Sequence, residues 1–146
     1  MQQTKEQQQQ NGKLLRVIPC YDELITFLKS WFAKTVPTLE KPILEINRYS
    51  GLLGSWQEVV KWQVTGGSRG ELKEISMICD TYTTLKVRII VAGLERTEKQ
   101  LQTALTLPYQ DLKLISGQVV VVYCKSDGAT AITFDACIVG KEIIKL

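Results

Sequence analysis

The sequence predicts a mainly β protein, an antiparallel β-sandwich that carries one N-terminal amphipathic helix and an extended N-terminal arm. Three observations support this class. Apolar and polar residues alternate through most runs after Pro42, Gly-rich or polar corners separate the runs, and one segment alone has convincing helical spacing. Short strands that follow one another in this way favour an antiparallel sandwich over the alternating strands and helices of a parallel sheet. The 146 residues suffice for one domain with a real core.

The first residues, "MQQTKEQQQQNGK", are rich in glutamine and too polar to bury an apolar face. We assign residues 1–15 to an extended arm and residues 16–146 to a single β-sandwich domain. A polar arm becomes ordered by lying on a neighbouring subunit. The arm therefore supplies four candidate interface residues, Gln7, Gln8, Gln9 and Gln10.

The segment "YDELITFLKSWFAKT" predicts a helix over about residues 22–35. Asp22 can cap its first turn, and Pro37 follows soon after its end. Its apolar stripe is wide and aromatic, so it must cover either the sheet of its own domain or a partner. The candidate interface residues of this stripe are Leu24, Phe27, Leu28, Trp31 and Phe32.

Period-two alternation predicts which side chains share a strand face. The four apolar sets are Leu44 and Ile46, then Val60, Trp62 and Val64, then Ile75, Met77 and Cys79, and then Leu85, Val87, Ile89 and Val91. Between these runs and the last strands lies "LERTEKQLQTAL", residues 94–105, which we expect to form a short helix or a long loop between the sheets.

The end of the chain predicts an apolar hairpin, in which "QVVVVYCKS" and "AITFDACIVG" flank a corner at Asp127-Gly128. Both faces of residues 119–124 are apolar, which favours a central strand covered on both sides. One face would pack against the core, and the other would pack against the helix or against another chain. Val120 and Val122 are candidate interface residues if they lie on an open face.

Composition argues against catalysis. The chain has no histidine, which removes the commonest general base and metal ligand, and its net charge of +3 is too small to indicate nucleic-acid binding. We predict that the protein is not an enzyme and has no cofactor, no metal and no small-molecule substrate. We also expect no membrane partner, because no apolar stretch reaches spanning length.

The four cysteines form no C-x-x-C pair, so a zinc site is not predicted. No apolar signal segment opens the chain, and we expect folding in a reducing cytoplasm. A disulfide between Cys124 and Cys137 across the predicted hairpin remains an alternative.

Trp56, in the loop "GLLGSW", is the tryptophan that we expect to be accessible to a partner. We count it among the candidate interface residues. Because an exposed aromatic ring can also stack on a sugar, Trp56 carries an alternative function, that of a carbohydrate- or receptor-binding module.

Three stretches from Gly70 onward carry a family resemblance: "GELKEISMICDTYTTLKVRIIVAG", "LTLPYQDLKLISGQVVVVYCKSDG" and "AITFDACIVGKEI". Their order of strands and corners, over about half of the chain, resembles that of small jelly-roll-like accessory proteins of tailed-bacteriophage virions. The resemblance is to the capsid decoration, or cement, type.

The resemblance implies a structural virion protein that binds the outside of the head as a homotrimer and contacts the major capsid protein. It would clamp neighbouring capsid subunits and stabilise the shell, and it would be located in the virion after assembly in the host cytoplasm. The arm and the helix lie outside the matched region, so the resemblance gives them no role. In the alternative function, the same fold would serve as a binding module of a phage tail or baseplate.

Overall fold

The computed structural model describes residues 22–31 and 37–146. The predicted arm, with its four glutamines, and Phe32 lie outside these residues. Contacts divide the chain into two units, Met1–Pro37 and Thr38–Leu146, and each is described by itself. The first contains a helix over residues 22–31, which confirms the predicted helix over that range. That the helix belongs to one domain with the strands stays a prediction.

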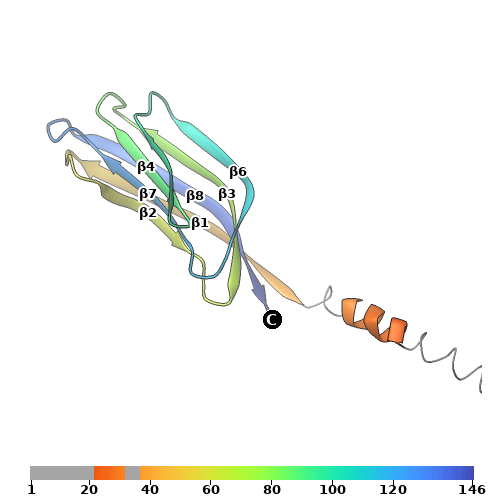
Figure 1. Cartoon of the computed structure of the whole chain (residues 1–146). Helices are drawn as coiled ribbons and strands as arrows, with labels where there is room; N and C mark the ends of the chain where they lie inside the picture. Colours follow the sequence, from red (N-terminus) through yellow and green to blue (C-terminus); the bar gives the residue numbers. More distant parts are fainter. Residues whose placement is uncertain (1–21, 32–36) are drawn as a thin grey trace, which may run out of the picture. The chain divides into compact units, whose positions relative to one another are not determined.

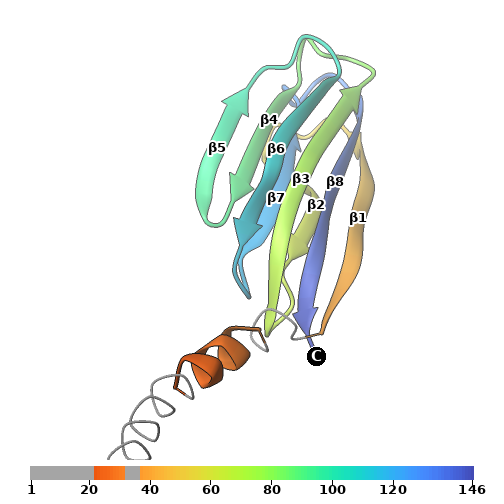
Figure 2. The ribbon, with the colours of Figure 1, turned by 90° about the vertical axis from the view of Figure 1, so that its right-hand side faces the viewer.

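The second unit holds eight strands in two antiparallel sheets of four, ordered β1-β8-β3-β6 and β2-β7-β4-β5 (Figures 1 and 2). The strands are β1 (Thr38–Gly51), β2 (Gln57–Gln63), β3 (Ser68–Cys79), β4 (Lys86–Val91), β5 (Leu94–Lys99), β6 (Leu105–Leu114), β7 (Val119–Lys125) and β8 (Ile132–Lys145). The pairs are nested, because β1 pairs with β8, β2 with β7, β3 with β6 and β4 with β5. The mainly β, antiparallel class is confirmed, and the arrangement is consistent with a β-sandwich.

The core of this unit contains most of the apolar faces that alternation predicts. The buried side chains include Val60, Trp62, Val64, Ile75, Met77, Cys79, Leu85, Val87, Ile89 and Val91, together with Ile132, Phe134, Ala136 and Ile138 of β8. Val120, Val122 and Cys124 of β7 are also fully buried in this core. We therefore assign Val120 and Val122 to the core rather than to an interface.

The predicted terminal hairpin is wrong. β7 and β8 belong to different sheets, because β7 lies between β2 and β4 while β8 lies between β1 and β3. Each strand has one fully buried face, and residues 126–131 carry the chain from one sheet to the other. Asp127 shapes this connection by accepting hydrogen bonds from the Ala129 and Thr130 amides.

The separation of these two strands also excludes the disulfide alternative. Cys124 faces the core from β7, whereas Cys137 is half-buried on β8, and both thiols are free. Burial raises the pKa of the Cys124 thiol to about 12, so it behaves as a small apolar side chain.

The expectation of a helix or loop over residues 94–105 is wrong for its first half, which forms the edge strand β5. A two-residue turn joins β4 to β5, and both of its residues, Ala92 and Gly93, have positive φ angles of 54° and 78°. This is the backbone of a tight hairpin turn, which Gly adopts without cost and Ala only with strain. The sequence pattern does not indicate this turn, because its first residue is alanine rather than Gly, Asn or Asp.

Trp62 and Glu142 tie the two sheets together at one end of the core. The indole Nε1 of Trp62 in β2 donates to Oε1 of Glu142 in β8 over 3.0 Å, and the Thr65 amide donates to the same oxygen over 3.1 Å. Burial alone raises the pKa of Glu142, but the hydrogen bonds from Trp62 and Thr65 outweigh it and hold the pKa below its ordinary value.

Two glycines make room for the indole. A Cβ atom at Gly140 would lie 2.5 Å from the Glu71 carbonyl oxygen and 3.0 Å from the Trp62 ring, and one at Gly70 would meet Val64 at 2.7 Å. The close approach of β2 to the opposite sheet therefore requires glycine at both positions.

We predict that Gly140→Ala destabilises the fold by roughly 1–3 kcal/mol or more, because the added methyl group would overpack against a backbone oxygen that cannot move cheaply. Gly66→Ala is the matched control, since no atom lies within 4 Å of a Cβ built there. Urea denaturation followed by tryptophan fluorescence measures both. Equal unfolding free energies for the two variants would contradict the packing argument.

Glu142→Gln is expected to lose stability in a pH-dependent way. The lowered pKa of Glu142 means that the ionised carboxylate stabilises the fold above the unfolded pKa of about 4.3, and that this contribution is lost as pH falls. The variant should therefore be less stable than the wild type at about pH 7, and the gap should narrow towards about pH 3.5. Urea titrations at both pH values measure the difference in unfolding free energy between the variant and the wild type. Glu45→Gln, at an exposed position, is the control. A gap that stays constant with pH would count against this role of the carboxylate.

Candidate functional site

The outer face of sheet β1-β8-β3-β6 carries large apolar side chains. Leu44 and Ile46 of β1 are 62% and 65% exposed, and Ile78 of β3 is 53% exposed. In the strand register, Leu44 lies beside Val139 and Ile46 beside Cys137, both half-buried on β8. These five residues, Leu44, Ile46, Ile78, Cys137 and Val139, form what we call the apolar face.

The register of β1 explains this face, because it turns Leu44 and Ile46 away from the core. Glu45 and Asn47 instead share the inner face with the buried Ile138 and Ala136 of β8. They lie at the edge of the sheet, where the Asn47 side-chain amide donates to the Val59 carbonyl of the opposite sheet over 2.8 Å. Leu44 and Ile46 therefore face the solvent, whereas Ile43 of the same strand is buried in the core.

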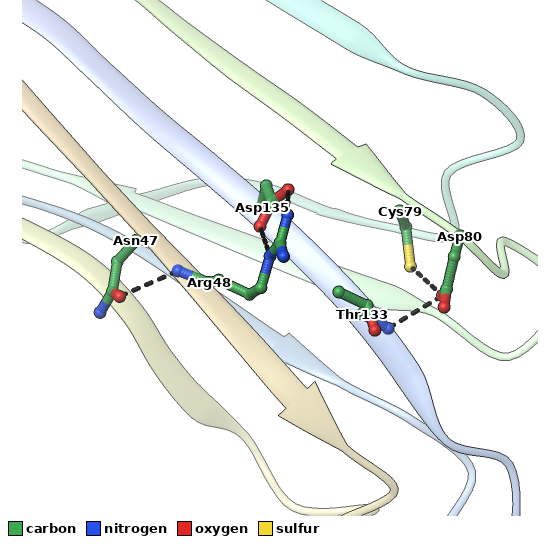
Figure 3. A network of polar contacts seen from close by, with 6 residues as sticks. All are labelled: Asn47, Arg48, Cys79, Asp80, Thr133 and Asp135. Atoms are coloured by element: carbon green, nitrogen blue, oxygen red, sulfur yellow. Dashed lines mark hydrogen bonds and ion pairs between the residues drawn. The ribbon is translucent and has the colours of Figure 1, made fainter.

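An ion pair borders the apolar face. Arg48 Nε and a terminal guanidinium nitrogen donate to the two carboxylate oxygens of Asp135 over 2.6 and 2.8 Å (Figure 3). The Arg48 guanidinium lowers the pKa of Asp135. Farther along β8, the Thr133 amide donates to Asp80, and the Cys79 thiol contacts the same carboxylate oxygen. The two charges of the ion pair cancel, so this border adds no net charge to the face.

The predicted interface residues of the helix are exposed in the first unit. The described ones are Leu24, Phe27, Leu28 and Trp31, which all lie on the ten-residue helix over 22–31. Their helical spacing places Leu24, Phe27, Leu28 and Trp31 along one side. They remain candidates for contact with a partner.

Trp56 is half-buried, and two cationic groups lie over its ring. The Lys125 ammonium is 4.4 Å from the ring centroid, and the Arg88 guanidinium carbon is 5.1 Å from it. Such cation–π contacts are attractive and hold both groups near the ring. Trp56 is therefore part of a cationic cluster. Its ring contacts two cationic groups, whereas stacking on a neutral sugar requires an open ring face.

The structure does not gather the predicted residues into one site. Val120 and Val122 are in the core, and Trp56 stands at the β2-β7-β4-β5 sheet. Sequence reasoning missed the role of Leu44, Ile46 and Ile78. The signal for the first two was present in the alternation of β1, but alternation does not say which face is turned outward.

Among residues 22–31 and 37–146, no three His, Cys, Asp or Glu side chains gather where they could hold a metal ion. In the same part of the chain, no helix has the length and apolar character needed to cross a membrane.

Comparison with known proteins assigns no family: no protein-family model matches the chain, and no curated protein sequence matches it.

Proposed function

We propose that this protein is a structural assembly protein, a capsid decoration protein that associates with its own copies and clamps neighbouring subunits of a phage head. The observation that carries the proposal is the apolar face, with three large apolar side chains more than half exposed on one sheet. Scattered exposed apolar residues are ordinary, but a cluster on one sheet face is typical of a surface that a protein covers.

Copies of the same chain are the best occupants of this face. The Arg48–Asp135 pair beside it is internally neutralised, and Glu74, the β3 register partner of Val139, adds one further charge next to these residues, so the face is mainly apolar. Interfaces between identical subunits are more apolar than those of transient complexes. β1 also forms one edge of its sheet, and a long unpaired edge strand with apolar residues favours association unless something covers it.

The nested strand pairs support a jelly roll as the finer description of the fold. In a jelly roll a long antiparallel ribbon folds over into two sheets, which is the pattern that the pairs β1–β8, β2–β7, β3–β6 and β4–β5 make. A fold does not determine a function. The virion role therefore rests on the resemblance of the strand pattern from Gly70 onward, together with the apolar face.

The mechanism is one of contact area. A trimer with three equivalent binding surfaces engages several capsid subunits at once, and each contact after the first is effectively intramolecular. The complex with the assembled shell is then tighter than that with a free subunit, so opening the shell costs more free energy.

Ile46→Glu should turn the proposed homotrimer into a monomer, because it buries a charge in the self-contact without disturbing the core of the chain. Leu94→Glu is the matched control, since Leu94 is 58% exposed on β5 of the other sheet. Light scattering after gel filtration measures the mass of all three proteins. A monomeric wild type, or an Ile46→Glu variant that stays trimeric, would refute self-association through this face.

Heads carrying the wild-type protein are expected to rupture at a higher temperature than bare heads, because the clamp must be broken first. Co-sedimentation establishes occupancy, and a dye that binds the released genome reports rupture. Ile46→Glu should bind heads more weakly and protect them less. Equal rupture temperatures at full occupancy would show that the protein does not stabilise the shell.

A further inference from the structure

A polar hollow of about 400 Å³ lies where β4 begins and β7 ends, away from the apolar face. Four connections between strands contribute to it, together with those two strand ends. Its walls contain Gly54, Thr83, Thr84, Leu85, Lys86, Gln100, Lys125, Ser126 and Asp127. The volume is within the range of pockets that hold small ligands.

Two lysines line the hollow from neighbouring strands. Lys86 and Lys125 are direct partners in the β4–β7 register, so their side chains leave the same face side by side. Two like charges in this position repel each other. Among the side chains described in residues 37–95 and 100–146, no carboxylate forms an ion pair with either, whereas the nearby Arg88 has Glu95 at 3.3 Å. The Lys125 ammonium has a cation–π contact with Trp56, so Lys86 is the lysine whose charge would gain most from an anion placed between the two.

The one carboxylate in the wall, Asp127, is engaged in its own turn. Its Oδ1 accepts from the Ala129 amide over 2.9 Å and from the Thr130 amide over 2.7 Å, and its Oδ2 accepts from the Thr130 hydroxyl over 3.1 Å. These bonds lower the pKa of Asp127 and hold it as an anion. Its charge offsets that of one lysine, so the wall residues named above, all of them described, keep an excess of one positive charge.

The remaining wall is polar and fixed in place. The Ser126 amide donates to the Leu53 carbonyl over 2.9 Å, which joins two of the connections. The Gln100 side-chain amide donates to the Thr83 carbonyl over 2.7 Å, which joins two others. Thr83, Thr84 and Ser126 line the same space, and the buried Ser126 hydroxyl donates to the Thr130 carbonyl. A preorganised wall of hydroxyls and amides suits a ligand with many hydroxyl groups.

We propose that this hollow binds an acidic saccharide, with the carboxylate of the sugar between Lys86 and Lys125. The lysine pair recognises the negative charge, and the hydroxyl-lined wall accommodates the sugar ring. A nucleic acid fits less well, because Lys125 and Arg88 lie over the Trp56 ring where a base would stack, and the net charge is only +3. This inference does not depend on the proposed assembly role.

Titration of the full-length, isotope-labelled protein with glucuronic acid tests the proposal by nuclear magnetic resonance. We expect saturable shifts of the amides at residues 83–86 and 125–127, and none at the apolar face. Lys86→Gln should weaken binding about tenfold or more, since it removes one charged hydrogen-bond donor. Lys61→Gln, an exposed lysine of the same sheet outside the hollow, should bind as the wild type does.

Stability measurements separate a lost ligand contact from a damaged fold. Lys86→Gln removes a repulsion, so its unfolding free energy should equal or slightly exceed that of the wild type. Glucose should fail to bind, which would show that the acid group is required. The proposal is overturned if inorganic phosphate binds as tightly as glucuronic acid, if a short single-stranded DNA binds tighter than either, or if none shifts these amides.

Discussion

The hydrogen bond between Trp62 and Glu142, packed over Gly70 and Gly140, is the constraint on which the arrangement of the sheets depends. It joins β2 of one sheet to β8 of the other, and the two glycines allow the indole to come within contact of the backbone. β8 in turn pairs with both β1 and β3. The position of β8 therefore determines which residues of its neighbours face the core, including the outward turn of Leu44 and Ile46.

The apolar face follows from this register, which leaves Leu44 and Ile46 exposed to solvent in the isolated chain. A shift of β1 by one residue would bury Leu44 and Ile46, but it would also take Ile43 and Tyr49 away from the core. The long pairing of β1 with β8 and the hydrogen bond from Asn47 to the Val59 carbonyl hold the other register. The register that buries Ile43 therefore leaves Leu44 and Ile46 outward, where a second subunit could cover them.

Most core faces could be predicted from the sequence because alternation is a local property. Val60, Trp62 and Val64 are buried as their spacing indicates, and so are the even-numbered residues of β8 from Ile132 to Ile138. Pairing is not local, which is why the sequence predicts a hairpin of β7 and β8 although these strands lie in different sheets. The turn before β5 could not be predicted for a different reason. Ala92 has a positive φ angle, which among residue types is common only for Gly and, less often, Asn. The pairing of Lys86 with Lys125 needs the β4–β7 register, and no spacing along the chain reveals it.

The two proposed surfaces are compatible because they lie on different sheets. Association through the outer face of β1-β8-β3-β6 leaves the end of β4 and β7, with its lysine pair, on the other sheet. A shallow site held by two lysines and a few hydroxyls is expected to bind a single acidic sugar only weakly. A trimer would present three such sites together, and simultaneous engagement of neighbouring sugars on one surface can exceed the single-site affinity by about 10²–10⁴ when the geometry allows it. Self-association would then serve both surfaces, by covering the apolar face and by making the weak saccharide sites multivalent.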